Sequence, residues 1–296
     1  MKKRIYATLQ TAGSRAMVIL LAAAMIGLSG CASKQTASLP AITPAPTGQH
    51  QVGKFVWFDL LTEDVQAAQK FYGELFGWQF KTKGNSSDYI VINSGDKPIG
   101  GIASYNNKES EDQVSIWLAS LSVEDVDRAV SATKARYGKV LDAPIDVKGR
   151  GRMAVIQDPE GAELVLIRAA GGDPVDAAVN SGEWLWVDLF TRDAKAAGEF
   201  YGALAGYVPQ SVENGEDHSY NLLKKGSRAY GGVVELRWEE VEPNWLPYIK
   251  VDDLEETISQ AEKLEGILIL RIENVAIIAD PSGGVFGIQM VKGDKS

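Results

Sequence analysis

One stretch of this chain occurs twice. Residues 57–78 read WFDLLTEDVQAAQKFYGELFGW, and residues 186–207 read WVDLFTRDAKAAGEFYGALAGY. The two stretches agree at 12 of 22 positions, with a constant offset of 129 residues. A repeat at fixed spacing indicates that one structural unit has been duplicated.

A second and weaker repeat follows each copy. Residues 115–129 and 246–259 are similar to each other, and so are VIQDPEGAELVLI at 155–167 and IIADPSGGVFGIQ at 277–289. Each of the four units opens with an apolar strand and an amphipathic helix, and short strand-like runs follow. Asp64 is placed to cap the first helix, and Gly77 and Gly266 to end the first and the fourth. The pattern predicts four βαβββ units.

Two motifs accompany these units: D-x-x-A-A-x-x-F-Y-G-x-L-x-G after the first strand and D-P-x-G before the last one. In these features residues 53–292 resemble the vicinal oxygen chelate superfamily, which includes glyoxalase I, the bleomycin-resistance proteins and the extradiol dioxygenases. The resemblance implies an α+β fold in which four βαβββ units form two tandem glyoxalase-like domains. Each domain would be an open, eight-stranded, cup-like sheet with helices outside. The predicted domains are residues 53–170 and 184–292, joined by a linker at 171–183.

The resemblance also implies one divalent metal, held by side chains of the first and last strands of the units. Carried onto this chain, six family ligand positions fall on Trp57, Leu118, Trp186, Leu246, Val165 and Gly287. None of these side chains can donate to a metal. The remaining position falls near residues 102–104 and 234–235, where only Glu235 carries a carboxylate, and the chain has only two histidines, His50 and His218. We therefore expect no metal and no other cofactor at a family-type site.

A Trp-x-Asp sequence opens both copies of the repeat. Because strand side chains alternate, Asp59 shares a face with Trp57, and Asp188 shares a face with Trp186. A ring beside a carboxylate suits a flat or cationic organic ligand. The competing interpretation is that the tryptophans fill space and the aspartates accept internal hydrogen bonds. The sequence leaves both open.

Arg152 and Tyr248 complete the predicted ligand-binding set, which is Trp57, Asp59, Arg152, Trp186, Asp188 and Tyr248. Arg152 precedes a strand expected to line the first cup, where it would pair with Asp59 or with an anionic group; the competing interpretation is a solvated turn charge. Tyr248 shares a strand face with Leu246. The glycine pairs at 100–101 and 231–232 are interpreted as bulges or close backbone approaches. No catalytic residue is predicted.

The N-terminus has the layout of a secretory signal. Residues 1–4 are basic, and residues 16–28 are apolar and carry no charge. Thirteen apolar residues are fewer than the roughly 20 that a membrane-spanning helix needs. The ending Leu28-Ser29-Gly30-Cys31 resembles the bacterial lipobox, so residues 1–31 are predicted to be a lipoprotein signal peptide with Cys31 as the lipid attachment site. A signal anchor is the competing interpretation.

Residues 32–52 are rich in Pro, Ser and Thr and are predicted to be a tether that holds the body tens of Å from the bilayer. Because Ala32 and not Asp follows the cysteine, the resemblance implies an outer-membrane protein facing the periplasm if the source is Gram-negative. Cys31 is the only cysteine, so no disulfide can form within the chain.

Charge limits the partners of the mature chain. Loss of Lys2, Lys3, Arg4 and Arg15 with the signal peptide leaves 26 basic residues against 39 acidic ones, a net charge of −13. Such a charge argues against binding to nucleic acid or directly to anionic lipid. The predicted partners are a small-molecule ligand and, through Cys31, the membrane.

Three hypotheses of function remain. The first is a metal-free glyoxalase/bleomycin-resistance-like lipoprotein that binds or sequesters a small molecule in the cell envelope. The second is a lyase or isomerase with a non-standard carboxylate site, in which Asp59 or Asp188 acts as the general base. The third is a structural envelope protein whose cups are packed cores and whose outer surface binds other proteins.

The lipobox generates the first testable prediction. Wild-type protein should incorporate labelled palmitate in its bacterial host, and Cys31→Ala should abolish the label because the thiol is the only acceptor. Incorporation is measured on immunoprecipitated protein. A wild-type protein that takes up no label would contradict the prediction.

Overall fold

The computed structural model describes residues 38–82, 89–105, 115–214 and 218–291. The predicted signal peptide and Cys31 lie outside the described residues. No helix within those ranges is long and apolar enough to cross a bilayer.

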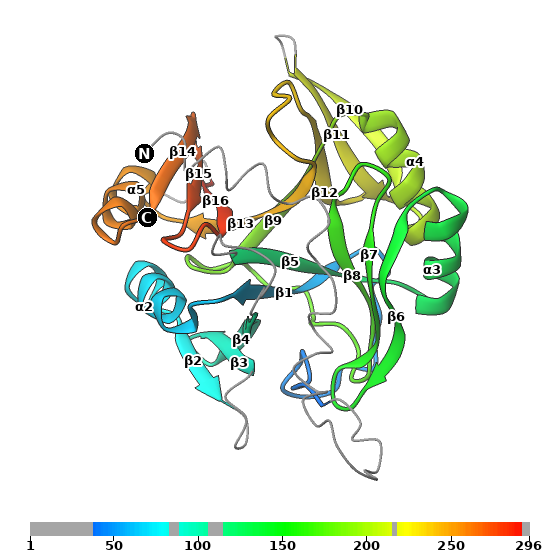
Figure 1. Cartoon of the computed structure of the whole chain (residues 1–296), viewed down its shortest axis with the longest axis horizontal. Coiled ribbons are helices and arrows are strands. Elements are labelled where there is room, and N and C mark those ends of the chain that lie inside the picture. Colours follow the sequence, from blue (N-terminus) through cyan, green and yellow to red (C-terminus); the bar gives the residue numbers. More distant parts are fainter. Residues whose placement is uncertain (1–37, 83–88, 106–114, 215–217, 292–296) are drawn as a thin grey trace. The chain divides into compact units, whose positions relative to one another are not determined.

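The described chain forms four βαβββ modules in sequence order (Figure 1). Module 1 contains β1 (Phe55–Thr62), α2 (Val65–Phe76), β2 (Gln79–Thr82), β3 (Tyr89–Ser94) and β4 (Lys97–Ser104). Module 2 contains β5 (Ser115–Ser122), α3 (Val126–Ala135), β6 (Lys139–Val147), β7 (Gly151–Gln157) and β8 (Glu163–Ala169). Module 3 contains β9 (Trp184–Thr191), α4 (Ala194–Ala205), β10 (Val208–Asn214), β11 (His218–Lys225) and β12 (Arg228–Glu235). Module 4 contains β13 (Asn244–Val251), α5 (Leu254–Lys263), β14 (Ile267–Ile272), β15 (Val275–Ala279) and β16 (Val285–Met290).

The strands form two open sheets of eight. The first has the order β2-β3-β4-β1-β5-β8-β7-β6, and the second has the order β10-β11-β12-β9-β13-β16-β15-β14. In every module the first strand runs parallel to the last one, as β1 does to β4 and β9 to β12. The other neighbouring strands within a module are antiparallel, as in β3 with β4 and β11 with β12. The predicted α+β fold with two tandem eight-stranded sheets is confirmed.

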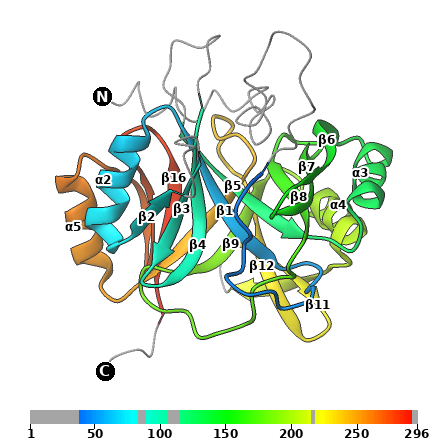
Figure 2. The ribbon, with the colours of Figure 1, turned by 90° about the horizontal axis from the view of Figure 1, so that it is seen from below.

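The two compact units of the chain do not coincide with the two sheets. One compact unit, the 2–3 unit, combines modules 2 and 3 with the preceding segment up to Trp57, and the other, the 1–4 unit, combines modules 1 and 4. Within the 2–3 unit α3 packs against α4, and within the 1–4 unit α2 packs against α5 (Figure 2). Each compact unit therefore joins one module from each half of the chain.

Two sequence motifs of the repeat meet in the 2–3 unit. The hydroxyl of Tyr201, from F-Y-G in α4, donates to Asp158 Oδ2 at 3.0 Å, in the D-P-x-G turn of module 2. The indole of Trp245 donates to the same tyrosine oxygen at 2.9 Å. The other oxygen of Asp158 accepts the backbone N–H groups of residues 160–162. A helix of module 3 is thus fastened to a turn of module 2.

The same arrangement holds the 1–4 unit together. Tyr72 of α2 donates to Asp280 at 2.9 Å, and the indole of Trp117 donates to Tyr72 at 2.9 Å. Ser115 adds a hydrogen bond to Asp280 at 3.3 Å. Both tyrosines are fully buried, at 0% exposure, and aromatic rings surround Tyr72. The motifs that identify the repeat in sequence are therefore the contacts that pair the modules.

Burial changes the acidity of these groups. Desolvation raises the pKa of Asp158 and Asp280 above the ordinary value, against the hydrogen bonds from tyrosine and backbone, which lower it. Desolvation, together with the neighbouring carboxylate, also raises the pKa of Tyr72 and Tyr201 well above 10. The phenols are consequently donors throughout the physiological range.

The sequence correctly predicted both caps of α2 but not the residue that ends α5. Asp64 caps α2 by accepting the N–H of Ala67 at 2.8 Å, and Gly77 ends that helix in the left-handed conformation, as predicted. Gly266 does not end α5. The helix stops at Lys263, and the left-handed residue is Glu265, with φ of 67°.

Gly266 has a packing role instead. A Cβ at this position would lie 2.9 Å from both the Phe71 ring and the carbonyl of Ala261. The absence of a side chain lets α2 of module 1 approach the end of α5.

The segment before β1 is packed, not extended into solvent. Leu39, Ile42 and Thr43 are buried, and Ser38 forms a bridge with Lys148 beside β6. From Ser38 onward, the segment predicted as a tether is part of the 2–3 unit.

The module-pairing contact gives a stability prediction. Tyr201→Phe keeps the ring but leaves buried Asp158 and Trp245 without their shared partner, so the free energy of unfolding should fall by about 1–3 kcal/mol. The measurement is urea unfolding. Tyr137→Phe is the matched control, because Tyr137 is 90% exposed and should change stability by less than about 0.5 kcal/mol. Equal effects of the two substitutions would argue against a pairing role.

The raised pKa of Asp158 gives a pH prediction. In the window from about pH 4 up to the raised pKa, the folded state binds more protons than the unfolded state, so this carboxyl makes stability fall as pH rises. Asp158→Asn removes the titration. The unfolding free energy of the wild type minus that of the variant should therefore decrease as pH rises through this window. A difference that is flat or increasing would contradict the assigned direction.

Candidate functional site

Asp59 lies on β1 in a tight polar arrangement. Its side chain is fully buried, and the hydroxyl of Tyr89 on β3 donates to Asp59 Oδ1 at 2.5 Å. Gly101 of β4 stands opposite Asp59 in the sheet. A Cβ on Gly101 would lie 2.0 Å from the tyrosine oxygen and 2.5 Å from the carboxylate, so only glycine leaves room for the pair.

Module 3 repeats this arrangement. Tyr220 of β11 donates to Asp188 Oδ1 at 2.8 Å, and Gly232 of β12 stands opposite Asp188. A Cβ on Gly232 would lie 2.1 Å from the Tyr220 oxygen and 2.2 Å from Asp188. The preceding glycine of each pair is also closely approached by backbone, since a Cβ on Gly100 would lie 2.5 Å from the carbonyl of Phe58. The first glycine of each pair is thus a close backbone approach, whereas the second is approached by the tyrosine and aspartate side chains. A register shift lies next to each pair, so the bulge interpretation holds as well.

Sequence reasoning missed the two tyrosines. Tyr89 precedes Gly101 by twelve residues, and Tyr220 precedes Gly232 by the same interval. This spacing, shared by two modules, is the signal that identifies them.

The two copies differ in access to solvent. Asp59 is 0% exposed and Tyr89 is 7% exposed, so the first pair is sealed. Asp188 is 7% exposed, while Tyr220 is partly exposed. Trp186, two residues before Asp188 on β9, is partly exposed as well. The second copy is the more accessible of the two.

Trp57 is packed under a cation. The ring is 1% exposed, and the guanidinium of Arg150 lies 4.8 Å from its centroid. Arg150 is itself 0% exposed. A stacked guanidinium occupies one face of this ring, which a planar ligand would otherwise use. Sequence reasoning did not identify Arg150.

Arg152 pairs on the surface of module 2. Its guanidinium makes two hydrogen bonds to Asp127 of α3, at 2.5 and 2.8 Å, and an ion pair with Asp146 of β6 at 3.1 Å. The hydrogen bonds from Arg152 lower the pKa of Asp127. The contact with α3 places Arg152 on the side of β7 that faces the helix.

Tyr248 lies over one of the family ligand positions. It stands opposite Gly287 in the parallel pair of β13 and β16, and its side chain is 5% exposed. A Cβ on Gly287 would lie 2.2 Å from the Tyr248 ring. The ring therefore occupies the space that a metal-binding glutamate at position 287 would need.

The residues at the family positions do not fit a metal. Leu118, Val165 and Leu246 are buried hydrocarbon side chains, and Trp57, Trp186 and Gly287 offer no lone pair. In the described part of the chain, no three His, Cys, Asp or Glu side chains are grouped closely enough to hold an ion. The side chains at these six positions therefore do not fit the metal site that the resemblance implies.

Glu235 faces away from Asp188. It lies three residues after Gly232 in a regular part of β12, which puts the two on opposite faces of the sheet. With residues of α4 and β10 it lines an open groove of about 770 Å³ on the helix side. Glu235 is thus not placed to join Asp188 at one site.

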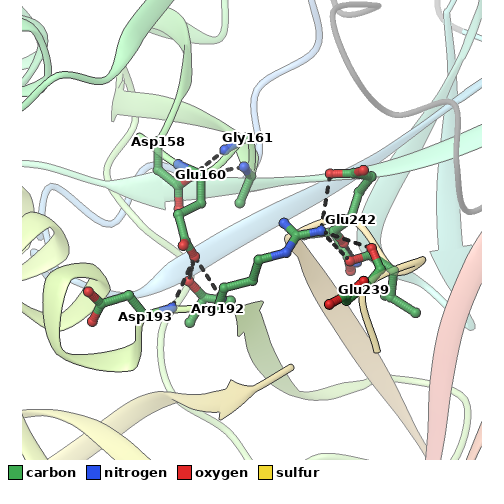
Figure 3. Close-up of polar contacts among 11 residues, drawn as sticks. Asp158, Glu160, Gly161, Arg192, Asp193, Glu239 and Glu242 are labelled. Carbon is green, nitrogen blue, oxygen red and sulfur yellow. Dashed lines mark hydrogen bonds and ion pairs between the residues drawn. The ribbon is translucent and has the colours of Figure 1, made fainter. Parts of the chain in front are cut away.

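A polar cluster ties the D-P-x-G turn of module 2 to module 3 (Figure 3). The carboxylate of Glu160 accepts the Thr191 hydroxyl and the N–H of Arg192 at 2.7 Å, at the start of α4. The Arg192 guanidinium donates to the carbonyls of Val241 and Glu239, at 3.1 and 3.3 Å. The cluster orders the loop between β12 and β13. At the corresponding positions the 1–4 unit has Ser282 and Glu63, which cannot reproduce it.

Comparison with known proteins agrees with this fold. Residues 54–166 match the model of the Glyoxalase/Bleomycin resistance protein/Dioxygenase superfamily. CFP32 of Mycobacterium bovis, whose name describes it as a glyoxylase, is 29% identical over 249 residues, which is 81% of this chain and 95% of that protein. The anthracycline biosynthesis protein DauV of Streptomyces sp. (strain C5) is 27% identical over 263 residues, covering 80% of this chain and 92% of DauV.

Solved structures show the same fold at low identity. A variant of homoprotocatechuate 2,3-dioxygenase from B. fuscum superposes with a TM-score of 0.56 at 12% identity, over 86% of this chain and 77% of the enzyme. The Mn(II)-bound glyoxalase from Novosphingobium aromaticivorans gives 0.54 at 13% identity, over 81% of this chain and 82% of the glyoxalase. The matched model identifies residues 54–166 as a domain of the Glyoxalase/Bleomycin resistance protein/Dioxygenase superfamily, and the second pair of βαβββ modules repeats the same strand order.

Proposed function

We propose that this protein is a metal-independent, membrane-anchored binding protein of the superfamily, which takes up a small organic molecule in the cell envelope. One observation carries the proposal. Asp188 is fixed by Tyr220 on a face of β9 where the tyrosine is partly exposed, while six family metal-ligand positions carry side chains without donors and Glu235, near a further one, faces away from Asp188.

The Asp188 site offers charge and an aromatic surface together. Hydrogen bonding from Tyr220 fixes the orientation of the carboxylate before any ligand arrives, which reduces the entropy cost of binding. Tyr220 is a partly exposed aromatic residue, and Trp186 precedes Asp188 by one strand period. Such a site favours a flat or cationic molecule over an anion.

The Asp59 site has a structural role under this proposal. The same three residue types are present, but here the aspartate and the tyrosine are both buried, and Gly101 leaves room for their side chains. A satisfied internal acceptor stabilises the module without contacting a ligand. The duplicated Trp-x-Asp sequence thus serves packing in the first copy and binding in the second.

Anchoring is supported by the sequence alone. The charge-free apolar run and Leu28-Ser29-Gly30-Cys31 have the form of a lipoprotein signal. Two or more acyl chains at Cys31 would hold the protein at a membrane, which its net charge of −13 would not.

A lyase or isomerase is the second candidate, because CFP32 bears the name of a glyoxylase and aligns with 81% of this chain. Asp188 would then be the general base, and the hydrogen bond from Tyr220 would orient its carboxylate. Conversion of the bound molecule during incubation would favour this candidate; recovery of the molecule unchanged would favour binding alone.

Native mass spectrometry tests the binding proposal. Full-length protein extracted from its own host in mild detergent should carry a non-covalent adduct of small mass. Asp188→Asn preserves shape, so the fold should persist while affinity for the identified molecule drops by roughly 10- to 150-fold, the loss of one charged hydrogen bond. The matched control Asp59→Asn should keep the affinity and instead lower the melting temperature. Loss of affinity in Asp59→Asn but not in Asp188→Asn would refute the assignment.

Elemental analysis tests metal independence. Protein purified without chelator should contain well under one equivalent of Zn, Ni, Fe or Mn per chain, because the family positions lack donor atoms. About one equivalent, retained after gel filtration, would overturn this part of the proposal and restore metal-dependent chemistry.

A further inference from the structure

Residues 38–54 form a strap along the 2–3 unit, and the G-R-G sequence at 149–151 holds its first part. The N–H of Leu39 donates to the carbonyl of Lys148 at 3.0 Å, and Arg150 Nε donates to the carbonyl of Pro40 at 2.8 Å. Gly149 has φ of +85°, and a Cβ there would lie 2.4 Å from the carbonyl of Leu39. Glycine at 149 and arginine at 150 are both needed for this contact.

The second part of the strap is held by the linker after β8. The N–H of Thr47 donates to the carbonyl of Gly171 at 2.7 Å, and the N–H of Gln51 donates to the buried carboxylate of Asp173 at 2.6 Å. Gly172 has φ of +86°, and a Cβ there would lie 2.4 Å from the Thr47 hydroxyl. The two glycines of the G-G-D-P linker thus contact the strap directly.

Module 4 lacks the holding residues. Where module 2 has Gly149-Arg150-Gly151-Arg152, module 4 has Arg271-Ile272-Glu273-Asn274. The βαβββ fold is nevertheless intact in both modules. The G-R-G sequence is therefore a feature of the strap site and is not required by the module.

We propose that Gly149, Arg150, Gly172 and Asp173 form a clamp that fixes the strap and thereby sets the distance between the folded body and the membrane. The inference rests on the proposed acylation of Cys31. Only seven Cα–Cα steps separate Cys31 from Ser38, which reach about 25 Å when fully extended. A free chain from Cys31 to Lys54 would reach about 80 Å. The clamp keeps the 2–3 unit close to the lipid headgroups, so the ligand is met at the membrane surface.

Proteolysis of the membrane-bound protein tests the clamp. Acylated full-length protein in phosphatidylcholine vesicles is treated with proteinase K, and the intact mass of the released body gives its first residue. In the wild type the body should begin at or before Ser38. In Gly149→Val, whose side chain displaces Leu39, it should begin within 39–54. A wild-type body that begins within 39–54 would overturn the proposal.

Gly226→Val is the matched control for strain. Gly226, in the turn between β11 and β12, also has a positive φ, of +62°, but a Cβ there meets no atom within 4 Å. This variant should give the wild-type product. The same early cleavage in Gly226→Val as in Gly149→Val would attribute the effect to general destabilisation and overturn the clamp.

Two further variants address folding and rescue. Arg150→Met removes the bond to Pro40 without a left-handed clash and should also expose the strap, whereas Arg152→Met, two residues later on β7, should not. Adding Ser38→Cys and Lys148→Cys to Gly149→Val places a disulfide across a bridge already present, and oxidation should restore the wild-type product. Failure of the oxidised form to do so would contradict the clamp.

The membrane distance has its own measurement. Neutron reflectometry on a supported bilayer should give a gap of at most about 25 Å between headgroups and protein for the wild type and a larger gap for Gly149→Val. Equal gaps would refute the proposed role. Palmitate labelling separates the two ideas: an unlabelled protein with a protected strap would refute the anchor and leave the clamp, while a labelled protein with a labile strap would refute the clamp.

Discussion

The hydrogen bond from a helix tyrosine to the aspartate of D-P-x-G is the interaction on which the structure depends. In each compact unit it links a helix of one module to a turn of a module from the other half of the chain. The buried tyrosine also accepts an indole N–H, from Trp117 or Trp245, so three polar groups satisfy one another out of contact with water. Removing any one of the three leaves the others buried without a hydrogen-bond partner, so incorrect pairing of modules costs free energy.

These hydrogen bonds also explain why the family motifs are present although six of the family's metal-ligand positions carry no donor side chain. F-Y-G and D-P-x-G hold modules together, whereas the metal positions lie on strands and can change separately. At those positions this chain carries mostly hydrocarbon and aromatic side chains. At Gly287, which has no side chain, the ring of Tyr248 packs against the backbone. Sequence motifs therefore establish the fold and leave the chemistry to other residues.

The sequence predicted the fold well because its signals are local and repeated. Strand alternation, the capping aspartate at 64 and the left-handed Gly77 each depend on near neighbours, and the structure agrees with them. Which modules form a compact unit was not predictable, because it depends on contacts between Tyr201 and Asp158 across 43 residues and between Tyr72 and Asp280 across 208. Gly266 was misread for a related reason: its neighbour Phe71 is remote in sequence.

The site residues were harder to predict than the elements. Parity predicted that Trp and Asp share a face of each strand, but it could not say that Arg150 lies over Trp57, that Tyr89 and Tyr220 hold the carboxylates, or that the second copy is the more accessible one. Arg152 illustrates the limit, since its partners Asp127 and Asp146 belong to a helix and a strand whose packing the sequence does not specify. Exposure, not residue type, distinguishes the two Trp-x-Asp copies.

The central claim is that Asp188 and Tyr220 receive an organic ligand in a superfamily member without a metal. A crystal structure of protein purified from its own host, with diffraction data collected on both sides of the Zn, Fe, Ni and Mn absorption edges, tests it most directly. The account predicts density for an organic molecule against Tyr220 and Asp188 and no anomalous peak near any family ligand position. An anomalous peak at such a position, or an Asp188 region closed by protein side chains with no ligand density, would contradict it.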